Sequence, residues 1–333
     1  MQNSLFDLEN RYAILNKTGD PLERLNAIID WEIFRPILER LDAKVRKSNA
    51  GRKPTCRILI FKMLVLQRLN GLSDERLQYQ VTDRLSFMRF LGVALAGNVP
   101  DARTVWAIRE ALREHELTDA LFDRLNQALA ELGIELKSGQ IIYATFVPVP
   151  IQRNGRDNNA LIKAGAVPIE WGQDTKPNKL AHKDTKLIAS QACTDASVHD
   201  SQVLEAVLRD EAVGGKEVWA DSAYRSEEQE QSLNDSEHTS QINERAYWGK
   251  PLSESQEISN KAKSRVRARV EHVFGRMENS MGGIFIRTIG IARAKVGVTL
   301  MNLTYNLCRI EVLIRNKVIG IDRVGAPKIC PAA

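Results

Sequence analysis

The spacing of apolar residues changes once along the chain, near residue 135, and this change limits the fold more than any other feature. Before it, apolar residues recur every three or four positions, as on one face of an α-helix. After it, the run GQIIYATFVPVPI, which begins at Gly139, alternates and is rich in β-branched residues, so it predicts a strand. We therefore expect an all-helical domain, 1–135, followed by an α/β domain, 136–320.

The helices expected before the change are 21–43, 55–70, 74–91, 102–115 and 118–132. Pro36 should kink or split the first of them. Asn70 and Gly71 should end the second, after which Ser73 or Asp74 can cap the next. Asp101 is the expected N-cap of the helix 102–115.

The second half mixes strands and helices. Two more strands are expected, in LIASQACT from Leu187 and in GKEVWADSAY from Gly215. The polar segment 152–185 contains scattered Gly and Pro and is expected to be a loop. Segment 257–279 has the apolar spacing of a long amphipathic helix, and 291–317 that of a final, largely buried helix.

The composition narrows the class of protein. A net charge of +5 and a pI of about 9.0 indicate nucleic acid only weakly. No run of about 18 uncharged apolar residues occurs, so no membrane span is expected, and the N-terminus lacks the pattern of a signal peptide. The four cysteines are far apart and form no CxxC, which favours a reducing compartment without disulfides or a zinc site.

Two acidic residues stand where a site could be built. Asp221 follows the apolar residues Val218 to Ala220 and precedes a loop, a position at which α/β folds often carry functional groups. The alternative is a turn-capping Asp. Glu271 is the single acid among the basic residues of segment 261–276. It could face a metal while its neighbours hold DNA phosphates, or form an ordinary i,i+4 pair with Arg267.

Several motifs then occur in one order along almost the whole chain. GRKP, LSDERLQYQVTDRLSFMRFLG and VPDARTVW are followed by TDASVHDSQVL, VWADSAYRS, SRVRARVEHVFG, MGG and RTIGIARAK. From about Pro21 to Glu311, the chain resembles the insertion-sequence-five group of bacterial transposases, which belong to the DDE superfamily. The resemblance implies a helix-turn-helix-like DNA-binding domain over 1–135 and a ribonuclease-H-like DDE transposase domain with a mixed sheet over 136–320.

The resemblance also implies a chemistry. In such enzymes two Asp and one Glu hold two divalent ions, Mg²⁺ or Mn²⁺, which activate the attacking water or DNA 3′-hydroxyl and stabilise the leaving oxygen. Asp221 matches the second acid and Glu271 matches the Glu. The family's first strand reads roughly IIDAT, but this chain reads IIYAT, so Tyr143 occupies the first acid position. A neutral phenol is a poor ligand for Mg²⁺; a Tyr nucleophile, as in some recombinases, is the alternative.

A second departure concerns the sheet. The family carries a longer segment, including the second strand, between the counterparts of Asp184 and Lys186, whereas HKDTK here runs directly into LIASQ. The sheet is therefore expected to lack one strand, which would leave backbone groups unpaired. Asp157, Asp174 and Asp184 in the polar segment could replace the lost acid only without the preorganisation that a strand gives.

The family acts on double-stranded DNA, at terminal inverted repeats and target sites, as a homo-oligomer in the bacterial cytoplasm and nucleoid. Asp221 and Glu271 are the expected catalytic and metal-binding residues. Three interpretations stay open: an active transposase with a non-standard first ligand, a DNA-binding protein without catalysis (a remnant or a regulator of intact copies), and a misfolded remnant. Trp106 is expected in the core, and His199 and His272 are expected to be structural. The expected DNA-binding residues are Arg52, Lys53, Arg109, Arg265, Arg267 and Arg269.

Overall fold

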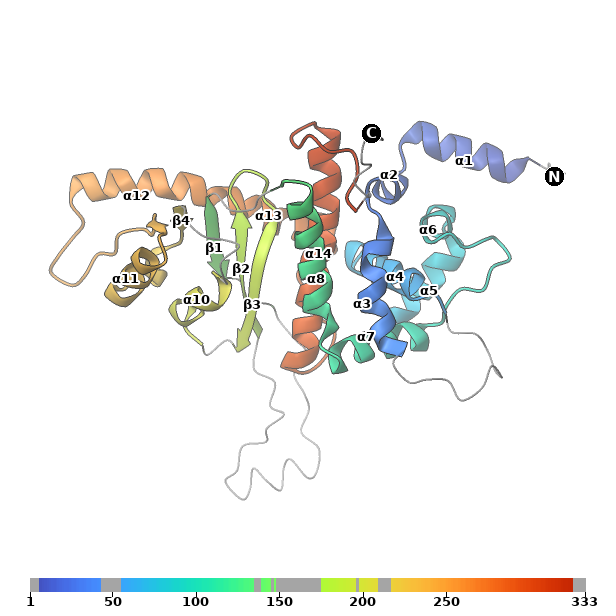
Figure 1. Ribbon diagram of the computed structural model, residues 1–333, viewed down its shortest axis with the longest axis horizontal. Helices are drawn as coiled ribbons and strands as arrows, with labels where there is room; N and C mark the ends of the chain where they lie inside the picture. The colour runs from blue at the N-terminus through green and yellow to red at the C-terminus, as the bar shows by residue number, and fades with distance from the viewer. Residues whose placement is uncertain are drawn as a thin grey trace, which may run out of the picture. The chain divides into compact units, whose positions relative to one another are not determined.

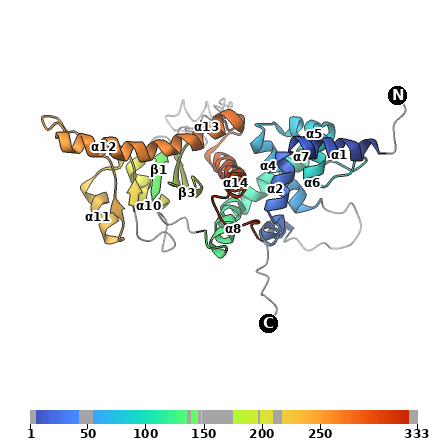
Figure 2. The ribbon, with the colours of Figure 1, turned by 90° about the horizontal axis from the view of Figure 1, so that it is seen from above.

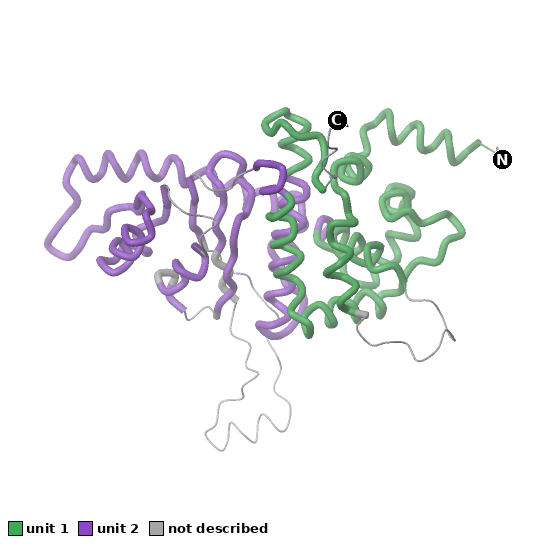
Figure 3. Tube along the Cα trace, viewed as in Figure 1, with its two compact units in different colours: residues 1–68, 72–128, 310–333 green, residues 69–71, 129–309 purple. Residues whose placement is uncertain are grey.

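The computed structural model describes residues 6–42, 55–134, 139–144, 147, 175–195, 198–208 and 217–325. The chain divides into two compact units, which Figure 3 colours separately. The first comprises 1–68, 72–128 and 310–333, and the second comprises 69–71 and 129–309.

The described part of the first unit is built from helices, as the apolar spacing predicts. Asp101 caps α7 by accepting a hydrogen bond of 2.7 Å from the amide of Thr104, and Ser73 caps α5 in the same way. Gly71, at φ +60°, follows the end of α4. The helices are α1 (Asp7–Thr18), α2 (Pro21–Ile28), α3 (Arg35–Leu38), α4 (Arg57–Leu69), α5 (Asp74–Asp83), α6 (Leu85–Leu91), α7 (Ala102–Glu114) and α8 (Leu117–Glu131).

Two of the expected helices are interrupted. The segment 21–43 breaks at Ile29, upstream of Pro36, which lies in the first turn of α3. At the break, Ile29 is extended and forms a parallel bridge with Val324 near the C-terminus. The segment 74–91 breaks at Arg84, whose extended backbone separates α5 from α6.

The second unit contains a five-stranded mixed sheet of order β3-β2-β1-β4-β5. The central strand β1 pairs antiparallel with β2 and parallel with β4, so backbone partners flank it on both sides. β2 pairs antiparallel with β3, and β4 pairs parallel with β5. The strands are β1 (Gln140–Ala144), β2 (Thr175–His182), β3 (Ile188–Asp195), β4 (Glu217–Trp219) and β5 (Thr239–Ser240).

The expectation that the sheet lacks one strand is wrong. Residues 175–182, which were expected to be loop, form β2 and fill the place between β1 and β3. A tight turn joins β2 to β3, with Lys186 at φ +60° donating its amide to the carbonyl of His182 at 2.8 Å. The rest of the expected loop, 152–174, lies outside the described residues.

One long helix, α14 (Ile291–Arg315), holds this hairpin. The buried side chain of Asn306 donates from its amide nitrogen to the carbonyl of Ile188 at 2.8 Å. Its Oδ1 atom accepts a hydrogen bond of 2.9 Å from the backbone amide of Ile188. The hydroxyl of Tyr305 donates to the carbonyl of Lys186 at 3.0 Å. These side-chain bonds satisfy backbone groups that a short, polar hairpin would otherwise leave unpaired.

Helices cover both faces of the sheet (Figures 1 and 2). On one face, apolar residues of β1, β2 and β4 pack against α10 (Leu204–Val207) and α11 (Glu227–Asp235). The opposite face meets a long helical segment made of α12 (Glu254–Arg267), a 3-10 turn (Ala268–Val270) and α13 (Glu271–Ser280). The single helix expected over 257–279 therefore contains one tightened turn. Within the described residues, no helix has the length and apolar content needed to cross a bilayer.

Candidate active site

Tyr143 and Asp221 lie near the C-terminal ends of two neighbouring parallel strands, at the side of the sheet that we call its C-terminal edge. The parallel strands β1 and β4 pair Gln140 with Val218 and Ile141 with Trp219. Tyr143 lies two residues after Ile141 in β1, and Asp221 lies two residues after Trp219, where β4 ends. The carboxyl ends of parallel strands are where α/β proteins commonly place functional groups.

Asp221 has an accessible carboxylate with two contacts. Its Oδ1 atom accepts a hydrogen bond of 2.8 Å from the amide of Ala223 and so caps the short turn after β4. Its Oδ2 atom lies 3.6 Å from Nη2 of Arg267 on α12, and the side chain is 44% exposed. Asp221 therefore caps this turn with Oδ1, while Oδ2 lies near Arg267.

Glu271 is the first residue of α13, and its neighbours on the helix touch this edge. Arg267, four residues earlier, contacts Asp221, and Phe274, three residues later, packs edge-on against the ring of Tyr143 with centroids 4.8 Å apart. Residues three apart share one face of a helix, so Glu271 and Phe274 lie on one side of α13. Its side chain is exposed, and Arg267 directs its guanidinium to Asp221 rather than forming the expected pair with Glu271.

Tyr143 is suited neither to bind a metal ion nor to act as a nucleophile. Its side chain is buried, and no described residue forms a hydrogen bond with its hydroxyl. Burial raises the pKa of Tyr143 well above its ordinary value of 10, so the phenol stays neutral at physiological pH. A neutral, desolvated phenol is neither a ligand for a hard cation nor an activated nucleophile, which also argues against the recombinase-like alternative.

Sequence reasoning missed Lys179 because it placed this residue in a loop. Lys179 pairs with Tyr143 across β1 and β2, and its side chain is 0% exposed. Its Nζ atom donates to the sulfur of Met277 at 3.6 Å and lies 5.7 Å from the ring centroid of Phe274. Burial lowers the pKa of Lys179 to about 7. A buried amine therefore lies directly opposite Tyr143.

The residues of this edge do not fit a two-metal centre. Two divalent ions in one site need several carboxylate oxygens, and the candidate residues are Asp221, Glu271, a neutral phenol and an amine. Across the described ranges, no three His, Cys, Asp or Glu side chains form a group able to hold a metal. Asp184 instead pairs with Arg269 at 2.9 Å. Asp157 and Asp174 lie outside the described residues.

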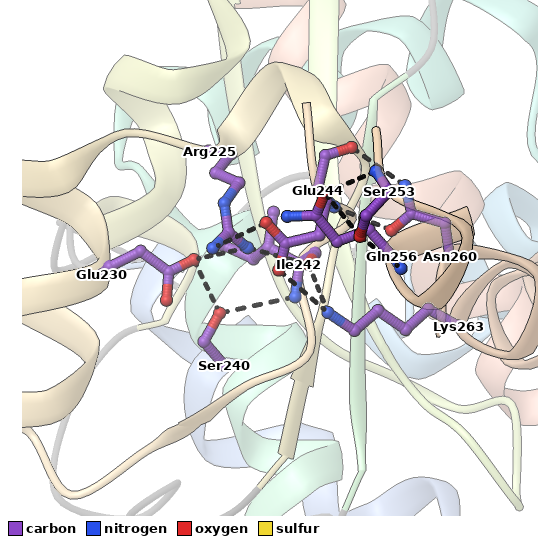
Figure 4. A network of polar contacts seen from close by, with 9 residues as sticks. All are labelled: Arg225, Glu230, Ser240, Ile242, Glu244, Ser253, Gln256, Asn260 and Lys263. Carbon is purple, nitrogen blue, oxygen red and sulfur yellow. Dashed lines mark hydrogen bonds and ion pairs between the residues drawn. The ribbon is translucent and has the colours of Figure 1, made fainter. Parts of the chain in front are cut away.

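A polar network fixes α12 next to the end of β5 (Figure 4). The amide of Glu244 donates to the side-chain oxygen of Asn260 at 2.8 Å, and the Asn260 amide returns a bond of 3.0 Å to the Glu244 carbonyl. Arg225 pairs with the Glu244 carboxylate at 3.0 Å, and Lys263 donates to the carbonyl of Ile242 at 2.8 Å. The network orients the helix that leads into Glu271.

The basic residues of α12 and of the turn after it fall into two groups, one that faces the sheet and one that is exposed. Lys263 and Arg267 face the sheet, where their contacts are Glu244, Ile242 and Asp221. Lys261, Arg265 and Arg269 recur every four residues and are exposed. We call these three residues the exposed basic stripe.

Arg109, an expected DNA-binding residue, does not lie at the surface. Arg109 is buried, and its guanidinium forms two hydrogen bonds with Asp74, at 2.7 and 2.8 Å, and one with Gln67 at 3.1 Å. Burial alone would raise the pKa of Asp74, but the hydrogen bonds and charge of Arg109 lower it below its ordinary value. Arg109 is therefore a packing residue. Trp106, on the same helix, is exposed rather than in the core.

The other expected residues have simpler outcomes. Arg52 and Lys53 lie outside the described residues. His199 and His272 are exposed, and their structural roles stay predictions.

Comparison with known proteins gives two family matches and one structural likeness. Residues 9–111 match a family described as a transposase domain, and residues 136–307, just over half of the 333, match the transposase DDE domain. A solved structure similar to this chain is the cryo-EM structure of the piggyBac transposase synaptic complex with hairpin DNA. Its sequence identity is 12% and its TM-score 0.46, over 92% of this chain and 77% of that chain.

Proposed function

Because the chain belongs to the transposase DDE domain family, we propose that it binds the ends of a bacterial insertion sequence but has lost most or all of its cleavage activity. In this proposal residues 1–135 and the exposed basic stripe hold double-stranded DNA, and 136–320 is an impaired ribonuclease-H-like domain. The chain would act as a homo-oligomer on DNA at the nucleoid, binding Mg²⁺ or Mn²⁺ weakly.

One observation supports the proposed loss of activity: Tyr143, which the resemblance places at the first acid position, is buried and neutral. Asp221 and Glu271 would be the two remaining catalytic carboxylates. Removing one carboxylate of such a set should cost several kcal/mol of transition-state stabilisation, at about 1.4 kcal/mol per tenfold in rate.

The second candidate function is regulation of intact transposase copies. The complete five-stranded sheet and its clamp by Asn306 favour a folded DNA-binding protein over a misfolded remnant. A folded chain that occupies element ends without cutting them would compete with active copies.

The exposed basic stripe gives the test of DNA binding. A gel shift with duplex DNA carrying the element ends, at several salt concentrations, should show steep loss of binding with salt. The Lys261→Ala/Arg265→Ala variant should bind more weakly and lower the salt slope by about 1 for each phosphate that the variant can no longer neutralise. Arg265→Lys is the matched control and should retain binding, because either cation can contact a phosphate.

The same DNA tests the loss of cleavage. Incubation of the unaltered chain with Mg²⁺ or Mn²⁺ should leave the strands uncut. Strand cleavage at the element ends would show that the proposed loss of catalysis is wrong. If the gel shift showed no salt-dependent binding, the proposed DNA binding would be wrong.

A further inference from the structure

Lys179 and Tyr143 face the same small region from neighbouring strands. They are directly opposite in the antiparallel register of β1 and β2, and side chains so paired have Cβ atoms about 4.5–5.5 Å apart on one face of the sheet. Both contact Phe274 of α13: the Tyr143 ring at 4.8 Å between centroids, and Lys179 Nζ at 5.7 Å from the centroid. The amine therefore lies within reach of any shorter side chain at position 143.

Among the described residues, no acidic side chain pairs with the amine of Lys179. Its donated bond goes to the sulfur of Met277, a weak acceptor, and no ion pair among the described residues includes Lys179. A buried amine of this kind gains most from a carboxylate brought next to it, because each group would relieve the other's desolvation.

We propose that Lys179 is a second barrier to metal binding, separate from the loss of the acid at position 143. A carboxylate introduced at 143 would pair with the Lys179 ammonium instead of remaining free for a cation. The positive charge would also repel a divalent ion near Asp221. This inference rests on the proposed function, since it takes the edge at Asp221 and Glu271 as the former metal site.

The test uses Mn²⁺ alone as the probe, without DNA. Isothermal titration compares Tyr143→Asp, Lys179→Met and the double variant Tyr143→Asp/Lys179→Met. The double variant should bind Mn²⁺ at least about tenfold more tightly than Tyr143→Asp, a change of the size seen when groups next to metal ligands are altered. Equal affinities of these two variants would overturn the inference, and so would failure of the double variant to bind Mn²⁺.

A second measurement needs no metal. In EDTA, Tyr143→Asp should have a higher melting temperature than Tyr143→Asn, because only the carboxylate pairs with the ammonium. This advantage of Asp over Asn should vanish or reverse when both are combined with Lys179→Met. The same advantage with and without Lys179 would contradict the pairing. Since neither measurement involves DNA, failure here is distinguishable from failure of the gel shift, which tests the proposed function.

Discussion

Replacing Lys179 by Met should stabilise the protein, because the amine is buried and pairs with no acidic side chain in the described part of the chain. Methionine has a similar length, is apolar and can occupy the space beside Met277 and Phe274. The benefit comes from removing a group whose charged form the core disfavours.

The size of the effect follows from the pKa of Lys179, which falls from 10.5 to about 7 on burial. At about 1.4 kcal/mol per pKa unit, this difference corresponds to about 5 kcal/mol. Below pH 7 the lysine is protonated in both the folded and the unfolded chain, so the whole cost is present. Between pH 7 and 10.5 only the unfolded chain keeps the proton, so the free energy of unfolding rises with pH. Above pH 10.5 the cost is gone.

Urea unfolding followed by circular dichroism between pH 6 and pH 10 measures this effect. The free energy of unfolding of Lys179→Met should exceed that of the unaltered chain by up to about 5 kcal/mol at pH 6. This difference should shrink toward zero as the pH approaches 10. Lys261→Met is the control, because Lys261 is exposed and its replacement should change stability little. A Lys179→Met variant with no gain at pH 6, or with a gain that does not depend on pH, would refute the reasoning.

Two further changes test packing. Arg109→Ala should destabilise the chain by about 3–5 kcal/mol in urea unfolding, because it leaves the carboxylate of Asp74 partly buried without its partner; an effect below about 1 kcal/mol would contradict the buried pair. Gly282→Ala should lower the melting temperature more than Gly133→Ala. Both glycines have positive φ, but only at Gly282 would the added Cβ meet backbone, 2.8 Å from Cα of Gly71, so equal losses would argue against that close approach.

Local patterns predicted several elements well, because their causes lie within a few residues. Helix α7 begins where Asp101 offers a cap and continues with the apolar spacing of a buried face. The strand pattern from Leu187 is confirmed as β3, and the acid-bearing helix is present with one tightened turn. The ordered motifs predicted the transposase family, which the family matches confirm.

Long-range pairing decided what local patterns missed. Segment 175–182 is polar and contains Pro177, so nothing in its composition predicts a strand. It forms β2 because β1 and β3 offer backbone partners on both sides. Likewise, the extended Ile29, where the helix breaks, pairs with Val324 near the other end of the chain, which a local pattern cannot predict.

For the candidate site too, the sequence determined some features and the tertiary structure determined others. From the sequence alone came the candidate groups: the acids Asp221 and Glu271, and Tyr143 at the position where the resemblance implies a third acid. Only the tertiary structure set Lys179 opposite Tyr143, turned Arg267 to Asp221 and removed Arg109 from the surface. The sequence gives the type of each side chain, but its burial and its partners depend on segments far away in sequence. Burial and partners together control whether the side chain is charged.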